Sequence, residues 1–145
     1  MNSKLLFAAV FFISAVSVCA QEDCDLTVKM RGFRSTGNTV LVGLYGEKNA
    51  SGFPRREKAL TGSKAEVESE EETLSFKGLK PGTYAVAVLH DEDNNGKMST
   101  NFLRIPKEGY GFSNNAEVKM KAPSFEQASF ELRQDTTIMI DIKYF

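Results

Sequence analysis

Acidic and amide side chains are concentrated in residues 90–101, whose sequence is HDEDNNGKMSTN. Asp91, Asp93 and Asn95 occupy every second position, and Gly96 follows at once. Calcium takes about six to eight oxygen ligands from carboxylates, amides and carbonyls on a flexible loop. The pattern therefore predicts a Ca2+ site in which these three side chains are ligands and Gly96 allows the chain to bend.

The rest of this loop departs from an EF-hand. Lys97 would offer its backbone carbonyl oxygen, and Ser99 stands where a weaker or water-mediated ligand often lies. An EF-hand closes its loop of about 12 residues with a bidentate Glu, but Phe102 occupies that position here. Glu108 is the nearest downstream carboxylate that can swing back as a replacement. We therefore predict a weak calcium site with Glu108 as its distal ligand.

Two other readings of the same segment stay open. Magnesium fits it less well, because magnesium accepts few protein ligands and keeps much of its water. Asp, Asn and Gly also favour hydrogen-bonded turns that hold no ion at all. The loop is thus either a calcium site or a polar turn between two strands.

His90 is the only histidine of the chain and directly precedes Asp91. As a calcium ligand it is a poor choice, because hard cations prefer oxygen. An enzyme would need an acid/base pair, and His90, Asp91 and Glu108 are the only clustered candidates. That hypothesis requires the three side chains to meet in an open cleft.

A second unusual stretch, PKEGYGFSNN, covers residues 106–115. Its glycines flank Tyr110 and Phe112, and Asn114 and Asn115 follow. One hypothesis is a carbohydrate- or peptide-binding site, in which the aromatic rings form a platform and the two amides make hydrogen bonds. The alternative is that the two aromatic residues close one end of the core, as loop aromatics usually do.

The elements that position these residues are strands. Period-two alternation predicts half-buried strands at 25–31, 39–45, 73–79, 83–90 and 136–144, with weaker candidates at 65–69 and 128–132. Turn residues such as those of Lys80-Pro81-Gly82 separate them. We predict an all-β domain, an antiparallel β-sandwich of about seven strands with an immunoglobulin- or prealbumin-like architecture. The expected inward-facing residues are Val40, Val42, Leu44, Leu74, Phe76, Val86, Val88, Ile138, Ile140 and Ile142.

Two long connections, 46–62 and 90–123, interrupt the strands. The second carries Phe102, Leu103, Ile105, Tyr110 and Phe112, and we expect these apolar residues to pack on the domain. Near its end, Ser124 and Gln127 have capping-box spacing, which predicts a short helical turn.

The first 20 residues have the layout of a secretory signal peptide, with Lys4, an apolar run, and small residues before Gln21. Cleavage after Ala20 leaves a single domain, 21–145, exported to the periplasm or beyond the cell, with no transmembrane segment. A lipoprotein anchor at Cys19 is the alternative, although Val18 precedes it where a small residue is preferred. The mature chain keeps one cysteine, Cys24, which is either an inert thiol or the site of an intermolecular disulfide.

Charge excludes one class of partner. The chain has 18 basic and 19 acidic residues and a net charge of −1. Nucleic-acid binding needs a basic surface, so we expect no nucleic-acid partner. An exported protein of this kind would meet an envelope or extracellular partner, whose identity the sequence does not indicate.

The segment YAVAVLHDEDNNGKMSTNFLRIPKEGYGFSNNA, followed by APSFEQASF, resembles the bacterial family known as domain of unknown function 2141. The resemblance covers essentially the whole mature chain and implies a small exported β-sandwich protein with no assigned activity. The chain departs at Arg104, where the family usually has Gly, and at Ser99, where it often has Asp. Separately, FKGLKPGTYAVAV looks like the closing strands of prealbumin-like and collagen-adhesin B-type modules, which is an analogy of fold only.

Three hypotheses follow for the function. The first is a non-enzymatic, calcium-stabilised β-sandwich module with a binding or envelope-structural role. The second is a carbohydrate- or peptide-binding protein that uses Tyr110, Phe112, Asn114 and Asn115. The third is an enzyme built on His90, Asp91 and Glu108.

Overall fold

The computed structural model describes residues 22–145, and within this range the chain forms eight strands and four short helices. The strands are β1 Cys24–Arg31, β2 Thr39–Gly46, β3 Thr61–Glu66, β4 Glu71–Leu79, β5 Gly82–Asp91, β6 Gly109–Phe112, β7 Phe130–Leu132 and β8 Thr136–Asp141. The helices are η1 Glu47–Gly52, η2 Arg56–Lys58, η3 Ser113–Asn115 and α1 Phe125–Ala128.

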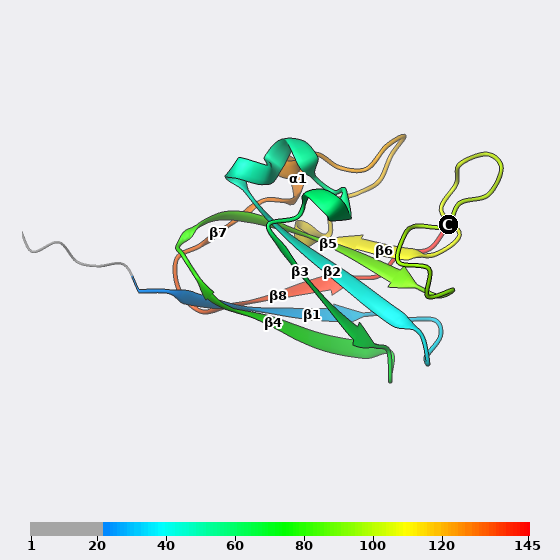
Figure 1. Cartoon of the computed structure of the whole chain (residues 1–145), viewed down its shortest axis with the longest axis horizontal. Helices are drawn as coiled ribbons and strands as arrows, with labels where there is room; N and C mark the ends of the chain where they lie inside the picture. The colour runs from blue at the N-terminus through cyan, green and yellow to red at the C-terminus, as the bar shows by residue number, and fades with distance from the viewer. Residues whose placement is uncertain (1–21) are drawn as a thin grey trace, which may run out of the picture.

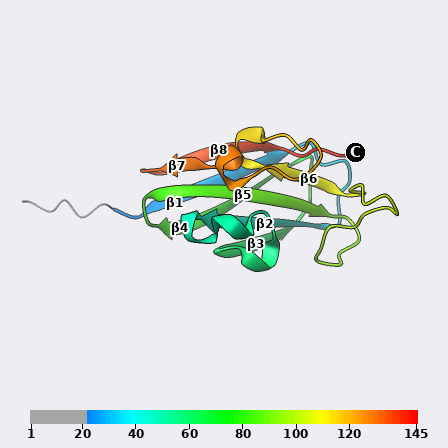
Figure 2. The ribbon, with the colours of Figure 1, turned by 90° about the horizontal axis from the view of Figure 1, so that it is seen from above.

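The strands form two sheets that pack face to face as a sandwich. One sheet has the order β4-β1-β8, and the other has the order β3-β2-β5-β6, with β7 paired to β5. Figure 1 shows β1, β4 and β8 as one layer and β2, β3, β5 and β6 as the other, and Figure 2 shows the strands of both layers running lengthwise. The predicted β-sandwich is therefore confirmed.

The core lies between the two sheets and consists of the residues that alternation assigns to the inner faces. Leu26, Val28 and Met30 of β1 are fully buried, and β2 and β5 contribute Val40, Val42, Leu44, Val86 and Val88. Phe76, Ile140 and Ile142 are also buried, while Leu74 and Ile138 are partly buried against the same cluster. All ten of the predicted inward-facing residues thus pack in the core.

The pairing of the strands differs from the prediction in three details. β1 pairs with β8 in parallel, so the first and the last strand of the chain lie side by side in the three-stranded sheet. β3 begins at Thr61 rather than at Ala65, and its residues are mostly exposed, so apolar alternation marks it poorly. β6 was expected to be a loop, but its backbone extends the five-stranded sheet beside β5.

The short helix α1 is capped as its sequence predicts. The Ser124 side chain accepts a hydrogen bond from the Gln127 N–H, and Gln127 Oε1 accepts one from the Ser124 N–H at 2.9 Å. This reciprocal capping box satisfies two N–H groups that a helix start otherwise leaves without partners.

The two glycines of β6 allow that strand to lie directly against β8. A Cβ atom at Gly111 would come within 2.5 Å of Ile140 Cγ2 and 3.2 Å of the Asp141 carbonyl oxygen. At Gly109, it would come within 2.5 Å of the Tyr144 ring. The glycines that flank Tyr110 therefore permit close packing between the sheets.

Gly111→Ala is expected to lower the free energy of unfolding by about 1–3 kcal/mol, because the added methyl group overpacks the contact with Ile140. Chemical denaturation measures the change. The matched control is Gly46→Ala in β2, where a Cβ atom would meet its nearest neighbour at an ordinary 3.8 Å. Equal effects of the two substitutions would show that β6 does not need a glycine at position 111.

The expectation that the apolar residues of this connection pack on the domain is confirmed for Tyr110 and Phe112, which belong to a second apolar cluster, and is wrong for Phe102, Leu103 and Ile105. Phe102 is 92% exposed, Leu103 is 63% exposed and Ile105 is 39% exposed. These residues form a tight turn in which Asn101 Oδ1 accepts hydrogen bonds from the N–H groups of Leu103 and Ile105. The turn projects from the end of the sandwich because local hydrogen bonds, rather than burial of its apolar side chains, determine its conformation.

Cys24 lies in the core and is 2% exposed. Burial, followed by the negative charges of Asp135, Asp23 and Asp25, raises the pKa of its thiol. A buried thiol with a raised pKa is a poor nucleophile. These properties favour the inert thiol over the intermolecular disulfide.

The predicted signal peptide and the lipoprotein alternative at Cys19 lie outside the described residues. In the part of the chain that the structure does describe, no helix has the length and apolar character needed to cross a membrane.

Candidate metal centre

Asp91 is the last residue of β5 and lies at the rim of the sandwich. Alternation along β5 turns His90 toward the core and Asp91 toward the opposite face of the sheet. The carboxylate accepts hydrogen bonds from the Asn95 N–H (3.0 Å, Oδ1) and the Gly96 N–H (2.8 Å, Oδ2). The chain can fold back in this way because Gly96 has a φ of 80°, a conformation that glycine adopts without steric cost.

Glu108 reaches the same point from the other end of the loop. It directly precedes β6, and its side chain is 3% exposed. Its Oε1 accepts hydrogen bonds from the N–H groups of Glu92 (2.9 Å) and Asp93 (3.3 Å), and its Oε2 accepts one from the Ser99 N–H (2.7 Å). Glu108 therefore holds both the start and the middle of the loop, which we call the carboxylate loop (residues 91–108).

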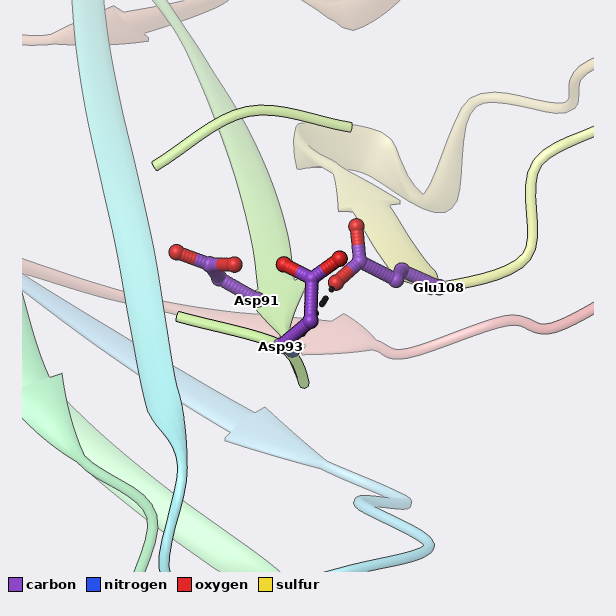
Figure 3. A group of neighbouring side chains, drawn as sticks. All are labelled: Asp91, Asp93 and Glu108. Carbon is purple, nitrogen blue, oxygen red and sulfur yellow. Dashed lines mark hydrogen bonds between the residues drawn. The ribbon is translucent and has the colours of Figure 1, made fainter. Parts of the chain in front are cut away.

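Asp93 completes the group and is the exposed member. Its Oδ2 accepts hydrogen bonds from the Ser99 hydroxyl (2.7 Å) and from Asn95 Nδ2 (2.8 Å). The hydrogen bond from Ser99 and then the Asn95 N–H lower the pKa of Asp93, so its carboxylate is charged over a wide pH range. Figure 3 shows the carboxylate groups of Asp93 and Glu108 side by side, with that of Asp91 on the other side of Asp93.

The geometry of these three carboxylates suits a metal ion. One oxygen atom from each lies within 4.8 Å of the others. Calcium–oxygen bonds are about 2.3–2.6 Å long, so the ligands of one ion lie within about 5 Å of each other. Asp91 and Glu108 are also nearly buried, and neighbouring buried carboxylates are costly unless hydrogen bonds or a counter-charge compensate them. The triad could therefore hold a metal ion.

The other predicted ligands lie around the triad but face it less directly. Asn95 points its Nδ2 at Asp93 and Ser99, while its Oδ1 accepts a hydrogen bond from the Lys97 N–H at 2.9 Å. Ser99 connects Asp93 with Glu108 through its hydroxyl and its N–H. Ligation by Asn95 and by the Lys97 carbonyl stays a prediction.

Arg34 positions the carboxylate loop, and the sequence analysis did not identify it. Its guanidinium donates to Glu92 Oε1 (3.0 Å) and Oε2 (2.6 Å) and to the Lys107 carbonyl oxygen (2.9 Å). Glu92 and Lys107 stand near the two ends of the loop, so Arg34 joins these ends. Arg34 lies after β1, 58 residues before Glu92, and no local pattern in the sequence predicts this contact.

His90 does not share the site with Asp91 and Glu108. Its ring is fully buried, with Nδ1 2.7 Å from the Tyr144 hydroxyl and Nε2 hydrogen-bonded to Asn38 Oδ1. Its ring also packs edge-on against Phe33. The three residues of the enzyme hypothesis therefore do not meet in one cleft, and His90 has the contacts of a structural histidine.

His90 should make the stability of the protein depend on pH. Burial lowers the pKa of His90 below its ordinary value of 6.5, because the charged ring loses its water. In the unfolded chain the ring takes up a proton near pH 6.5, so the unfolded state binds more protons below that value. Neutral His90 therefore contributes fully to the free energy of unfolding above pH 6.5. This contribution is lost as the pH falls toward the pKa of His90 in the folded protein, which is below 6.5.

We therefore expect the free energy of unfolding to fall between about pH 7 and pH 5, where histidine titrates. The His90→Gln variant should be less stable at every pH. Its free energy of unfolding should not fall between pH 7 and pH 5, because the variant contains no histidine. Urea denaturation across the range measures both proteins. The same slope in the variant would assign the pH dependence to other groups.

The four residues of the ligand-binding hypothesis divide into two pairs. Phe112 packs in a second apolar cluster with Tyr45 and Phe125, and both Tyr110 and Phe112 line an apolar pocket on the outer face of the five-stranded sheet. Asn114 Nδ2 donates to the Ser129 carbonyl oxygen at 2.7 Å. Asn115 Oδ1 accepts a hydrogen bond from the Asp141 N–H at 2.8 Å. The two amides thus make hydrogen bonds to the backbone of neighbouring segments. Ligand binding by the four residues stays a prediction.

Comparison with known proteins identifies one family. Residues 28–140 match the family described as "Uncharacterized protein conserved in bacteria (DUF2141)". This match spans the core strands and the whole carboxylate loop. No curated protein and no solved structure matches the chain.

Proposed function

The chain belongs to the DUF2141 family of bacterial proteins, and we propose that it is an exported, non-enzymatic β-sandwich module whose carboxylate loop binds calcium. The observation that carries this proposal is the position of Glu108. Its carboxylate lies with those of Asp91 and Asp93, although it is 17 residues from Asp91 and outside any EF-hand spacing.

Glu108 takes the part that the closing Glu has in an EF-hand. The chain makes the exposed turn at Phe102 and Leu103, returns through a bridge between Thr100 and Pro106, and brings Glu108 back to Ser99. Phe102 stands at the twelfth position of the loop, where an EF-hand has its closing Glu. Because the chain turns back after Phe102, Glu108 can supply the third carboxylate instead. The carboxylates of Asp91 and Glu108 are already ordered by backbone N–H groups, so little reorganisation is needed before an ion binds.

The chemistry of the site favours calcium over other cations. Its ligands would be oxygen atoms, which suit hard cations, whereas His90, the only imidazole of the chain, is buried elsewhere. Asn95 would join the ligands if its amide turned so that Oδ1 replaced Nδ2 beside Asp93. Such flexible coordination by many oxygen atoms is characteristic of calcium, while magnesium demands a smaller and more regular site.

A bound ion would stabilise the end of the sandwich from which the carboxylate loop projects. Figure 1 shows this loop at the end that also carries the C-terminus, opposite the start of β1. Calcium there would join the end of β5 to the start of β6 and hold the exposed turn in one orientation. We propose that this end meets an envelope or extracellular partner.

Calcium should raise the melting temperature of the mature protein, and magnesium at the same concentration should raise it less. Binding to the folded state adds RT ln(1 + [L]/Kd), or about 1.4 kcal/mol when calcium exceeds Kd tenfold. Differential scanning fluorimetry of protein dialysed against a chelator measures the shift. Equal shifts with the two ions would favour charge screening over a calcium site.

Export is the second part of the proposal. The layout of residues 1–20 supports cleavage after Ala20, so the exported protein should begin at Gln21. Intact-mass analysis of protein recovered from the producing bacterium tests this. A mature chain that begins with a lipid-modified Cys19 would instead establish membrane anchoring.

A further inference from the structure

The outer face of the five-stranded sheet carries a pocket that the calcium proposal does not use. Its volume is about 400 Å3, which is within the range of small-molecule sites. The floor is formed by β2, β5 and β6. The walls come from three connections: the segment around η2, the carboxylate loop, and the chain before α1. Figure 1 shows η1 and α1 on the same side of this sheet, away from β1, β4 and β8.

The register of the strands explains why this face is hollow. Gly43 of β2 lies opposite Ala87 of β5, and Ala87 lies opposite Phe112 of β6. The adjacent row across the same strands consists of Leu41, Leu89 and Tyr110. The Tyr45 ring covers Gly43, within 3.0 Å of the position of a Cβ atom there, so the depression lies at Ala87, and larger aliphatic and aromatic side chains surround it. An exposed sheet face normally carries polar residues, so an apolar hollow of this kind indicates a binding surface.

The rim of the pocket is mainly basic. Arg55, Arg56 and Lys97 line it, and Glu57 is the only acidic residue in the lining. Within residues 22–145, none of the ion pairs involves these three basic side chains. Arg56 makes a single long hydrogen bond, from Nη1 to the Gly96 carbonyl oxygen at 3.3 Å. The rim can therefore provide positive charge to a ligand.

We propose that this pocket binds a small amphipathic anion, a molecule with a compact apolar body and one carboxylate or sulfonate group. The apolar body would lie over Ala87, beside the Tyr45 ring that covers Gly43, and against the rings of Tyr110 and Phe112. The anionic group would lie at Arg55, Arg56 and Lys97. None of the three carboxylates of the calcium site takes part, and Lys97 would use its ammonium group here rather than the backbone carbonyl predicted to bind calcium, so removal of calcium leaves the apolar floor and the basic rim in place.

The test uses two fluorescent dyes that differ in charge. Anilinonaphthalene sulfonate has an aromatic body with a sulfonate group, and N-phenylnaphthylamine has the same kind of body without it. The mature protein should bind one sulfonate dye per chain, in calcium and in chelator alike, and decanoate should displace the dye better than decanol. Binding in both buffers separates this proposal from the calcium proposal.

Variants assign the binding to the pocket. Ala87→Leu fills the depression and should weaken binding of both dyes about tenfold, because the larger side chain occupies the space in which the apolar body of the dye would be buried. Arg55→Ala with Arg56→Ala should weaken the sulfonate dye about fivefold, as expected for two exposed ion pairs, and should leave the neutral dye unaffected. The double variant changes only exposed side chains, so it gives a result even if Ala87→Leu folds poorly. Lys29→Ala, an exposed lysine on β1 in the other sheet, is the control and should change neither dye.

Several results would overturn the proposal. They are the absence of saturable binding, unchanged binding in Ala87→Leu, and equal loss of both dyes in the arginine variant. Equal displacement by decanol and decanoate would assign the pocket to neutral ligands. Dye binding that falls as the protein concentration rises would mean that a second copy of the chain covers this face.

Discussion

Ile140→Ala is expected to lower the free energy of unfolding by about 2–5 kcal/mol, the range for truncating a fully buried Ile. Ile140 is fully buried in β8, and it contacts both layers of the sandwich. It pairs with Met30 of β1 within its own sheet, and its Cγ2 faces Gly111 of β6 in the other sheet. The cavity left by Ala would therefore lie between the two sheets, where the surrounding strands cannot easily collapse into it.

The neighbouring Met139→Ala is the matched control, because Met139 belongs to the same strand but points outward and is 40% exposed. Its truncation should change the free energy of unfolding by much less than that of Ile140. Urea denaturation of both variants measures the difference. If the two substitutions had equal effects, the inner and outer faces of β8 would be assigned wrongly.

Asp93→Ala is expected to remove most of the rise in melting temperature that calcium produces. Asp93 supplies one of the three carboxylates, and it is the exposed one, so its loss should affect the folded protein little when no calcium is added. For the native protein, a tenfold excess of calcium over Kd should give a rise of roughly 3–6 °C, from about 1.4 kcal/mol of binding. With the variant, the rise should approach zero.

Glu70→Ala separates ligation from general charge effects. Glu70 lies in the acidic run before β4 and is also exposed, so its removal changes the net charge by the same amount as Asp93→Ala. Calcium should still stabilise this variant fully. A full response from Asp93→Ala, or an equal loss in both variants, would mean that the carboxylate loop acts only as a turn.

The sequence predicts the core of this fold well because alternation in strands is a local property. The same period that buries Val86 and Val88 also places His90 inside and Asp91 on the opposite face. Separation of the histidine from the carboxylates could therefore have been expected from the sequence alone. The capping box of α1 is likewise a local pattern and is confirmed.

Contacts between distant segments could not be predicted from one sequence. The parallel pairing of β1 with β8 and the contact of Arg34 with Glu92 join residues far apart in the chain. For Glu108, the sequence indicated a candidate ligand, but only the fold shows that the turn at Phe102 brings it back to Asp91. No role could be assigned from the sequence to the glycines on either side of Tyr110, and the fold shows that they allow close packing against β8.

One residue of the exposed turn has an unusual backbone conformation. Arg104 has a φ of 61°, which is a left-handed conformation that glycine adopts more easily than other residues. The hydrogen bond from the Arg104 N–H to the Asn101 carbonyl oxygen, at 2.9 Å, supports this conformation.

Calorimetric titration of the mature protein with calcium tests the central claim most directly. The site should bind one ion per chain with a Kd of about 10⁻⁴–10⁻³ M, the range of extracellular calcium modules. Magnesium should bind more weakly, and Glu108→Gln should lower the calcium affinity because it removes one of the three carboxylates. Absence of calcium binding to the folded protein, or unchanged affinity in Glu108→Gln, would contradict the assignment of Asp91, Asp93 and Glu108 as a calcium site.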